Sequence, residues 1–175
     1  MSEDHIAGHK LNLARWFPQY DVRPLGEDDL PAMVRLGESN PLFYEHSSSA
    51  NTVDEHRADL TAAPPGIPPE RKHYVGFFDG DALIAALDLI DGYPDRETAF
   101  LGFFIVAGER SGQGLGSAII AELCACLKRV GFRRVRLAID RTNPQSNHFW
   151  RKQGFAVLRE VDRGRDVVYL AEKTL

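Results

Sequence analysis

Apolar and polar residues follow two periodicities along this chain, one typical of strands and one of helices. The clearest strand signal is a continuous apolar run at residues 99–106 (AFLGFFIV), which predicts a central strand covered on both faces. The clearest helix signal is residues 115–132, which are apolar on nearly every side and end near Gly131. Residues 134–140 (RVRLAID) place Val135, Leu137 and Ile139 at every second position, and this alternation predicts a further strand.

Weaker patterns predict the remaining elements. Two apolar segments flank residues 79–81 (DGD), a turn typical of a hairpin, and the chain closes as a second hairpin turning near Arg163-Gly164. A strand is expected over residues 20–25, followed by a helix over 26–39 that Asp28 or Asp29 caps and that has Pro31 in its first turn. A second helix is expected over 52–62, where Thr52 and Glu55 form a capping box. A short helix is expected to begin at Asn143 and to end at Gly154. The order β-α-α-β-β-β-α-β-α-β-β predicts an α/β (α+β) domain around one mixed sheet.

Length and pattern fit a single domain. The 175 residues leave little room for two domains. Residues 1–19 carry no pattern and are expected to form an N-terminal extension, although Trp16 and Phe17 could instead dock on the body. The domain itself is therefore predicted over residues 20–175.

Composition narrows the class of partner. The formal net charge of −4 offers no basic face for nucleic acid, and no apolar run is long enough to predict a membrane span. The N-terminus has no apolar signal segment, and Cys124 and Cys126 cannot face each other on a helix, which favours reduced thiols in a cytoplasmic protein. The six histidines show no zinc-ligand spacing, so no metal site is expected.

A glycine-rich loop joins the apolar strand to the long helix. It reads SGQGLGS over residues 111–117, and Gly112, Gly114 and Gly116 leave backbone N–H groups free to face an anion at a helix N-terminus. The loop is not a Walker loop, because no Gly-Lys-Ser/Thr follows, and it lacks the acidic strand end of a dinucleotide fingerprint. It therefore predicts a phosphate cradle, with a plain flexible turn as the alternative.

A second motif, further along the chain, makes the interpretation of the glycine loop more specific. The segment NPQSNHFWRKQGF at residues 143–155 follows SGQGLG in an order and spacing that resemble the GCN5-related N-acetyltransferase (GNAT) family. The resemblance runs from Tyr20 to the C-terminus. It implies a single GNAT-like domain with six or seven strands flanked by helices, and a V-shaped splay between the fourth and fifth strands. It further implies an enzyme that moves acetyl from acetyl-CoA directly to a primary amine of a small molecule or peptide, and it suggests a homodimer.

The resemblance also implies cofactor contacts by position. The loop would hold the pyrophosphate of coenzyme A, the strand edge at Ile105 and Val106 would offer backbone groups to the pantetheine arm, and Asn143 would hydrogen-bond that arm. The expected cofactor-binding residues are Phe104, Ile105, Val106, Arg110, Ser111, Gly112, Gln113, Gly114, Leu115, Gly116, Ser117, Asn143, Ser146, Phe149, Trp150 and Lys152. One departure is the first loop position, Ser111, where the family has Gln or Arg; Arg110 stands one residue earlier.

The other departure concerns catalysis. Trp150 stands where the family's tyrosine is thought to protonate the leaving thiolate, and an indole N–H cannot do so. A thiol of ordinary pKa near 8.5 already makes a tolerable leaving group. The expected oxyanion donor is a strand N–H near Ile105 or Val106. An enzyme without this acid is therefore expected.

The candidates for the base that deprotonates the amine are carboxylates near the central strand. These are Glu97 and Asp91, with Asp88 nearby, and each also fits a solvated turn or edge residue. Trp150 equally favours a second function class, a non-catalytic coenzyme A-binding or regulatory module. A third class, an unrelated anion-binding α/β domain, is disfavoured by the second motif.

Overall fold

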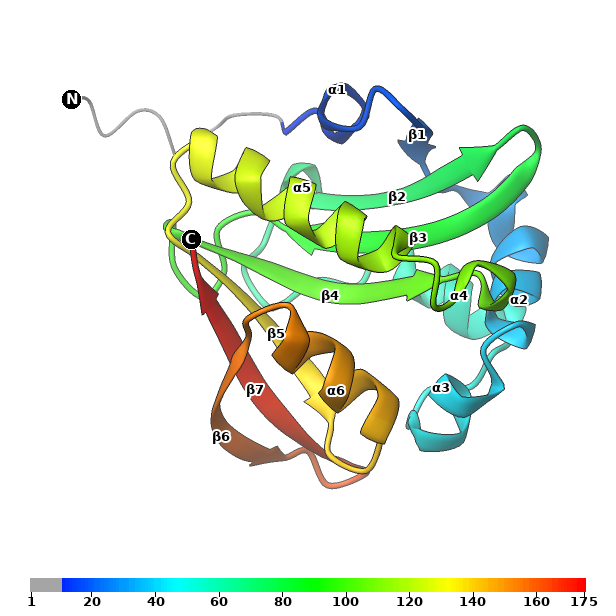
Figure 1. The fold of residues 1–175 in the computed structure, drawn as a ribbon. Coiled ribbons are helices and arrows are strands. Elements are labelled where there is room, and N and C mark those ends of the chain that lie inside the picture. Colours follow the sequence, from blue (N-terminus) through cyan, green and yellow to red (C-terminus); the bar gives the residue numbers. More distant parts are fainter. Residues whose placement is uncertain (1–10) are drawn as a thin grey trace.

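The computed structural model describes residues 11–175, which fold around a seven-stranded sheet (Figure 1). The strands are β1 (Asp21–Pro24), β2 (Lys72–Asp79), β3 (Ala82–Ile90), β4 (Thr98–Val106), β5 (Arg134–Asp140), β6 (Ala156–Asp162) and β7 (Val167–Thr174). Their order in the sheet is β1-β2-β3-β4-β5-β7-β6, and only the β4–β5 pair is parallel. The expected mixed sheet is confirmed.

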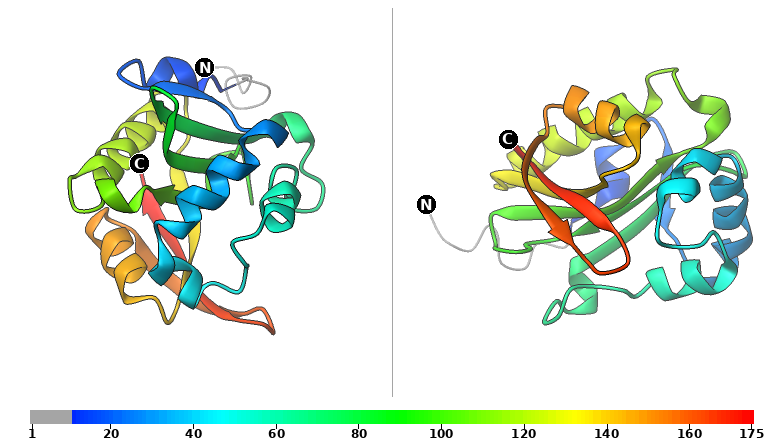
Figure 2. Two further views of the ribbon diagram at one scale, coloured as in Figure 1. Left: turned by 90° about the vertical axis from the view of Figure 1, so that its right-hand side faces the viewer. Right: turned by 90° about the horizontal axis from the view of Figure 1, so that it is seen from below.

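Helices cover both faces of this sheet. They are α1 (Leu13–Trp16), α2 (Leu30–Glu38), α3 (Pro41–His46), α4 (Val53–Asp59), α5 (Leu115–Arg129) and α6 (Pro144–Lys152), with short 3-10 turns at Glu27–Asp29, Pro69–Arg71 and Gly108–Arg110. Helix α5 lies on one face, and α2, α3 and α4 gather on the opposite side (Figure 2). Helix α3 was not foreseen, because its six residues are too few to show a helical period.

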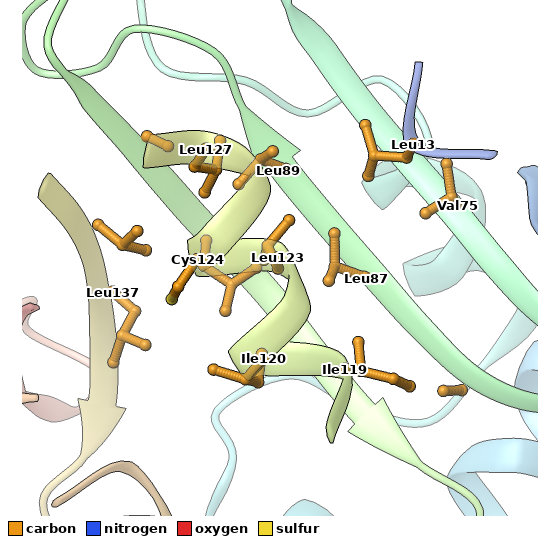
Figure 3. Close-up of a cluster of buried hydrophobic side chains, with 14 of the residues drawn as sticks. Leu13, Val75, Leu87, Leu89, Ile119, Ile120, Leu123, Cys124, Leu127 and Leu137 are labelled. Atoms are coloured by element: carbon orange, nitrogen blue, oxygen red, sulfur yellow. The ribbon is translucent and has the colours of Figure 1, made fainter. Parts of the chain in front are cut away.

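The two faces carry separate hydrophobic clusters. On one face, Ile119, Leu123 and Leu127 of α5 lie over Leu87 and Leu89 of β3, and all five side chains are almost fully buried (Figure 3). On the other face, α2 packs its own apolar stripe against β2, β3 and the distal half of β4. The apolar run of β4 is explained by this double coverage, as the sequence indicated.

Strands β4 and β5 pair over a short stretch and then separate. Their register runs from Thr98 opposite Arg134 to Leu101 opposite Leu137, although β4 continues to Val106 and β5 to Asp140. The separation begins beside a bulge: Asp88 pairs with Phe103 and Leu89 with Leu101, so Gly102 is the extra residue on β4. The expected V-shaped splay between the fourth and fifth strands is confirmed.

The chain before β1 contributes to the core. Leu13 is 3% exposed and Phe17 is fully buried, with its ring edge-on to Phe77 at a centroid distance of 5.0 Å. Within residues 11–19, the structure therefore shows Phe17 docked on the body of the domain, which is the alternative to a free extension. Residues 1–10 of the expected extension lie outside the described part, and the boundary at residue 20 stays a prediction.

Replacing Phe17 tests whether this segment stabilises the domain. Phe17→Ala should lower the free energy of unfolding by about 3–5 kcal/mol, because it empties a fully buried aromatic site. Denaturant titration measures the change, and Leu158→Ala, at a residue 48% exposed, serves as the control with little effect. A loss below about 1 kcal/mol for Phe17→Ala would contradict a structural role for residues 11–19.

Candidate functional site

The glycine loop opens helix α5 with backbone angles that favour glycine. Gly112 has φ +75° and Gly114, the N-cap, has φ +84°, and a Cβ added at either would meet no atom within 4 Å. The first N–H groups of a helix have no partner within the helix, and the helix dipole adds positive charge there. The loop therefore presents open, positively polarised backbone to an anion.

A cleft runs from this loop along the separated edge of β4. We name it the α5 cleft; its volume is about 380 Å³. Its lining includes these expected cofactor residues: Phe104, Ile105, Val106, Arg110, Ser111, Gly112, Gly114, Leu115, Gly116, Ser117, Ser146, Phe149, Trp150 and Lys152. Segments distant in sequence thus converge on one cleft, as the two linked motifs indicated.

Two expected cofactor residues do not line the α5 cleft. The Gln113 side chain donates to the backbone oxygen of Glu109 at 3.0 Å. Asn143 is 2% exposed and is the N-cap of α6, where its Oδ1 accepts a hydrogen bond from the Ser146 N–H at 3.0 Å. Asn143 therefore fixes the start of α6, and it lines a second cavity, described below, rather than the α5 cleft.

Four residues of the lining lie outside the expected cofactor set. They are Asn40, Phe43, Gln145 and His148. Gln145 and His148 lie inside the second motif and were accessible from it. Asn40 and Phe43 come from the start of α3, and no local pattern links that short helix to the splay.

The charged groups of the α5 cleft differ in how they are engaged. Arg110 forms an ion pair with Asp79 of β2 at 2.6 Å, so its guanidinium is already partnered at the rim. Lys152 is exposed on α6 and lines the cleft. The Ser117 hydroxyl accepts a hydrogen bond from Gln153 at 2.9 Å, which ties α5 to the end of α6.

The register of β4 decides which backbone groups face the splay. The Ala107 N–H donates to the Ile84 oxygen at 2.8 Å, and hydrogen-bonded pairs alternate along an antiparallel ladder. Ile105 and Phe103 therefore direct their backbone groups to β3, while those of Phe104 and Val106 face the splay. The Val106 carbonyl already accepts from the Asn40 amide at 2.9 Å. Ile105, whose backbone groups were expected to face the splay, thus directs them toward β3, and Phe104 directs its own into the splay.

Aromatic side chains form one wall of the α5 cleft. Trp150, 8% exposed, lies edge-on to Phe149 at 4.8 Å, to Phe155 at 5.2 Å and to Phe104 at 6.0 Å between ring centroids. A Cβ added at Gly116 would approach the Phe149 ring to 3.4 Å. The glycine therefore lets the first turn of α5 come close to α6.

A second cavity lies on the α3 and α4 side of the splay. We name it the α4 cavity; its volume is about 240 Å³. It shares four lining residues with the α5 cleft: Phe43, Phe104, Ser146 and Trp150. These four residues, which we name the junction, are where a group bound in one cavity would meet a group bound in the other.

Titratable side chains line the α4 cavity. Lys72 and Asp88 form an ion pair at 2.7 Å with side chains only 5% and 13% exposed, and burial raises the pKa of Asp88. Burial also raises the pKa of Asp59, lowers the pKa of His56, and raises the pKa of Tyr44 to about 12. The tyrosine stays a neutral hydroxyl across the physiological range.

The expected catalytic residues do not come together. Trp150 lies at the junction, but Glu97 and Asp91 line neither cavity. Glu97 precedes β4 and forms ion pairs with Arg133 at 3.1 Å and Arg134 at 3.5 Å. Asp91 follows β3, and its N–H donates to the Arg71 oxygen at 2.8 Å. Both belong to the paired end of β4, whereas the cavities lie at its separated end.

The described residues, 11–175, offer neither a metal site of three or more ligands nor a membrane-crossing helix. No group of three or more His, Cys, Asp or Glu side chains there is arranged to hold a metal ion. No helix in that range combines the length and apolar character needed to cross a membrane.

Solved structures share this fold. An acetyltransferase from Thermus thermophilus superposes with a TM-score of 0.70 at 24% identity, covering 96% of this chain and 100% of that chain. PaiA N-acetyltransferase from Thermoplasma acidophilum, in complex with coenzyme A, gives 0.64 at 18% identity, covering 89% and 99%. An acetyl transferase from Salmonella typhimurium that modifies the N-terminal serine of a 50S ribosomal subunit protein gives 0.70 at 16% identity, covering 89% and 95%.

Sequence comparison supplies the family. No curated protein sequence matches this chain. The family model described as acetyltransferase (GNAT) family matches residues 37–155, more than half of the chain, and spans both the glycine loop and the Asn143–Phe155 motif. The solved structures, each below 25% identity, agree at the level of the fold. The chain belongs to the GNAT acetyltransferase family, whose members use acetyl-CoA.

Proposed function

We propose that this protein is an acetyl-CoA-dependent N-acetyltransferase that transfers acetyl directly to a primary amine of a small molecule or peptide in a ternary complex. The observation that carries the proposal is the junction. Two cavities on opposite sides of the sheet meet there at Phe43, Phe104, Ser146 and Trp150. Such an arrangement suits two substrates that react without a covalent enzyme intermediate.

The residues of the α5 cleft fit coenzyme A. The open loop at Gly112 and Gly114 suits a pyrophosphate, and Lys152 adds a cation near it. The backbone groups of Phe104 and the N–H of Val106, which face the splay, suit the amide groups of the pantetheine arm. Bound acetyl-CoA supplies the activated acetyl thioester. The N–H of Phe104 or Val106 would then stabilise negative charge on the carbonyl oxygen, as an oxyanion donor.

Proton movements are the less determined part of the mechanism. An alkylamine has an ordinary pKa near 10.4 and must lose a proton before it attacks. Asp88 lines the acceptor side, whereas Glu97 and Asp91 lie away from both cavities, so we do not assign them the role of base. At the junction Trp150 has no acidic group, and Ser146 offers the only hydroxyl among the four shared residues. We propose that the thiolate leaves with at most a hydrogen bond from Ser146.

The second candidate is a non-catalytic coenzyme A-binding module of the same fold. Trp150 favours it, since the indole packs against three aromatic rings in the place of an acid. The α4 cavity favours the enzyme, because a module that only bound coenzyme A would not need a second, polar cavity at the thioester end of the cleft.

An acceptor screen separates the two functions. Acetyl-CoA with a panel of amines and peptides should release free thiol in an enzyme-dependent reaction, measured with a thiol-reactive dye. Binding of acetyl-CoA without acetylation of any member of the panel would support the module instead.

The cradle is tested by Gly114→Glu. We expect affinity for coenzyme A to fall by more than about tenfold, because a carboxylate would stand in the open space meant for phosphate. Calorimetry measures the affinity. Gly66→Glu is the matched control: Gly66 has φ +80° and equally open surroundings, but it lies outside the α5 cleft. Equal affinities for the two variants would refute the phosphate assignment.

The missing acid is tested by Trp150→Tyr. We expect kcat to rise by up to about tenfold, because a phenol at the junction can protonate the departing thiolate. Trp150→Phe is the control, since it removes the indole without adding a hydroxyl. A similar rise in both variants, or none in Trp150→Tyr with normal coenzyme binding, would leave Trp150 as a packing residue.

A further inference from the structure

One end of the α4 cavity carries hydrogen-bond acceptors that lack donors. We name this set the α4 pole; it consists of His56 and Asp59 on α4 and Asp88 on β3. The three are close enough to interact electrostatically, since Asp59 acts on both His56 and Asp88. Of the three, only Asp88 was expected near the site, as a candidate base, and His56 and Asp59 belong to neither sequence motif.

The tautomer of His56 is fixed by its neighbour Asn51. The Asn51 amide donates through Nδ2 to the Val34 oxygen at 3.0 Å, which leaves its Oδ1 to face the imidazole. Nε2 of His56 lies 2.7 Å from that Oδ1 and must therefore carry the proton. Nδ1 is then a bare acceptor. It is buried without a hydrogen-bond partner among the described residues, in a side chain that is 4% exposed overall.

The two carboxylates are also incompletely satisfied. Oδ2 of Asp88 accepts from Lys72, but Oδ1 is buried and has no partner among residues 11–175. Asp59 is half-buried and has no hydrogen bond or ion pair to a described residue, although the charges of Lys72 and Arg165 act on its carboxylate. Buried acceptors of this kind are costly unless a ligand or water supplies donors.

An ammonium group matches the α4 pole in both hydrogen bonding and charge. It has three N–H donors and no acceptor, against three acceptors that lack donors. Lys72 forms an ion pair with Asp88, whereas Asp59 forms no ion pair with any described residue. An ammonium would therefore pair with the Asp59 carboxylate, and burial lowers the pKa of His56, which favours its neutral form.

Other charged groups of the α4 cavity are engaged elsewhere or lie at its rim. Arg163, in the β6–β7 turn, is held by Asp166 at 2.7 Å. Asp140, at the end of β5, accepts from the Thr142 hydroxyl at 2.7 Å. Arg165 is exposed in the same turn. The α4 pole is therefore the part of the cavity best suited to a cation.

The amine bound at the α4 pole is not the one that reacts. None of the three pole residues lines the α5 cleft, whereas the thioester must reach the junction. An environment that stabilises positive charge also raises the pKa of an amine, which opposes formation of the neutral nucleophile. The pole suits a spectator ammonium, and the reacting amine belongs at the junction.

We propose that the acceptor is an aliphatic diamine, with one ammonium bound by His56, Asp59 and Asp88 while its other amine is acetylated at the junction. This inference rests on the proposed function and names its substrate class. The α4 pole binds the ammonium group that does not react, and the junction receives the neutral amine that is acetylated.

Calorimetry on the protein saturated with coenzyme A tests the inference without requiring turnover. Putrescine and cadaverine should bind at least about tenfold more tightly than 1,4-butanediol and 1,5-pentanediol, which match them in chain length but carry no ammonium group. Asp59→Asn should remove most of that preference. Asp54→Asn is the matched control, because Asp54 lies on the same helix with a side chain 94% exposed, and it should retain the preference.

Equal affinities of the diamines and the diols, or a preference for diamines that survives Asp59→Asn, would overturn the diamine assignment. The thiol-release assay reports on transfer separately. Tight diamine binding without thiol release would support the α4 pole and refute the transferase. A monoamine bound at the α4 pole by its single ammonium leaves no amine at the junction, so acetylation of n-butylamine and n-pentylamine as efficient as that of the diamines would uphold the transferase and refute the diamine assignment.

Discussion

The separation of β4 from β5 is the constraint on which the rest of this structure depends. Two parallel strands that pair over four positions and then diverge leave unpaired backbone in the middle of a sheet, which is tolerated only where another group can satisfy it. Gly102 marks the place: a Cβ there would lie 3.0 Å from the Asp88 carboxylate. Both cavities open through this gap, and the polar groups of Phe104 and Val106 face it.

The gap is held open by contacts from the first half of the chain and from α6. The hydroxyl of Ser39 accepts from the Gly108 N–H at 3.0 Å, and Asn40 donates to the Val106 oxygen, so the α2–α3 corner is fastened to the end of β4. On the other side, the aromatic rings of Phe149 and Trp150 fill the space beside Phe104. A site built on strands and packed rings in this way is pre-organised for two substrates.

Sequence reasoning succeeded where a residue's role depends on its own neighbours in the chain. Periodicity gave the strands and long helices, and the glycines of the loop indicated its backbone conformation. It failed where the role depends on register or on distant contacts. The hydrogen-bond ladder between β3 and β4 is needed to see that the backbone of Phe104, and not that of Ile105, faces the gap. The antiparallel course of the same two strands is needed to see that Asp88 lies at the cavities, whereas Asp91 and Glu97 lie away from them. The pairing of His56 with Asn51 carries no sequence signal.

The central claim is that an acetyl group delivered through the α5 cleft comes to rest at the junction. Nuclear Overhauser measurements with acetyl-CoA carrying an isotope-labelled acetyl methyl test it directly, since the chain has only two tryptophans to assign. The account predicts contacts from that methyl group to the ring protons of Phe104 and Trp150. Contacts to Trp16 or to the paired end of β4 near Tyr93 and Phe100, with none to Trp150, would contradict it.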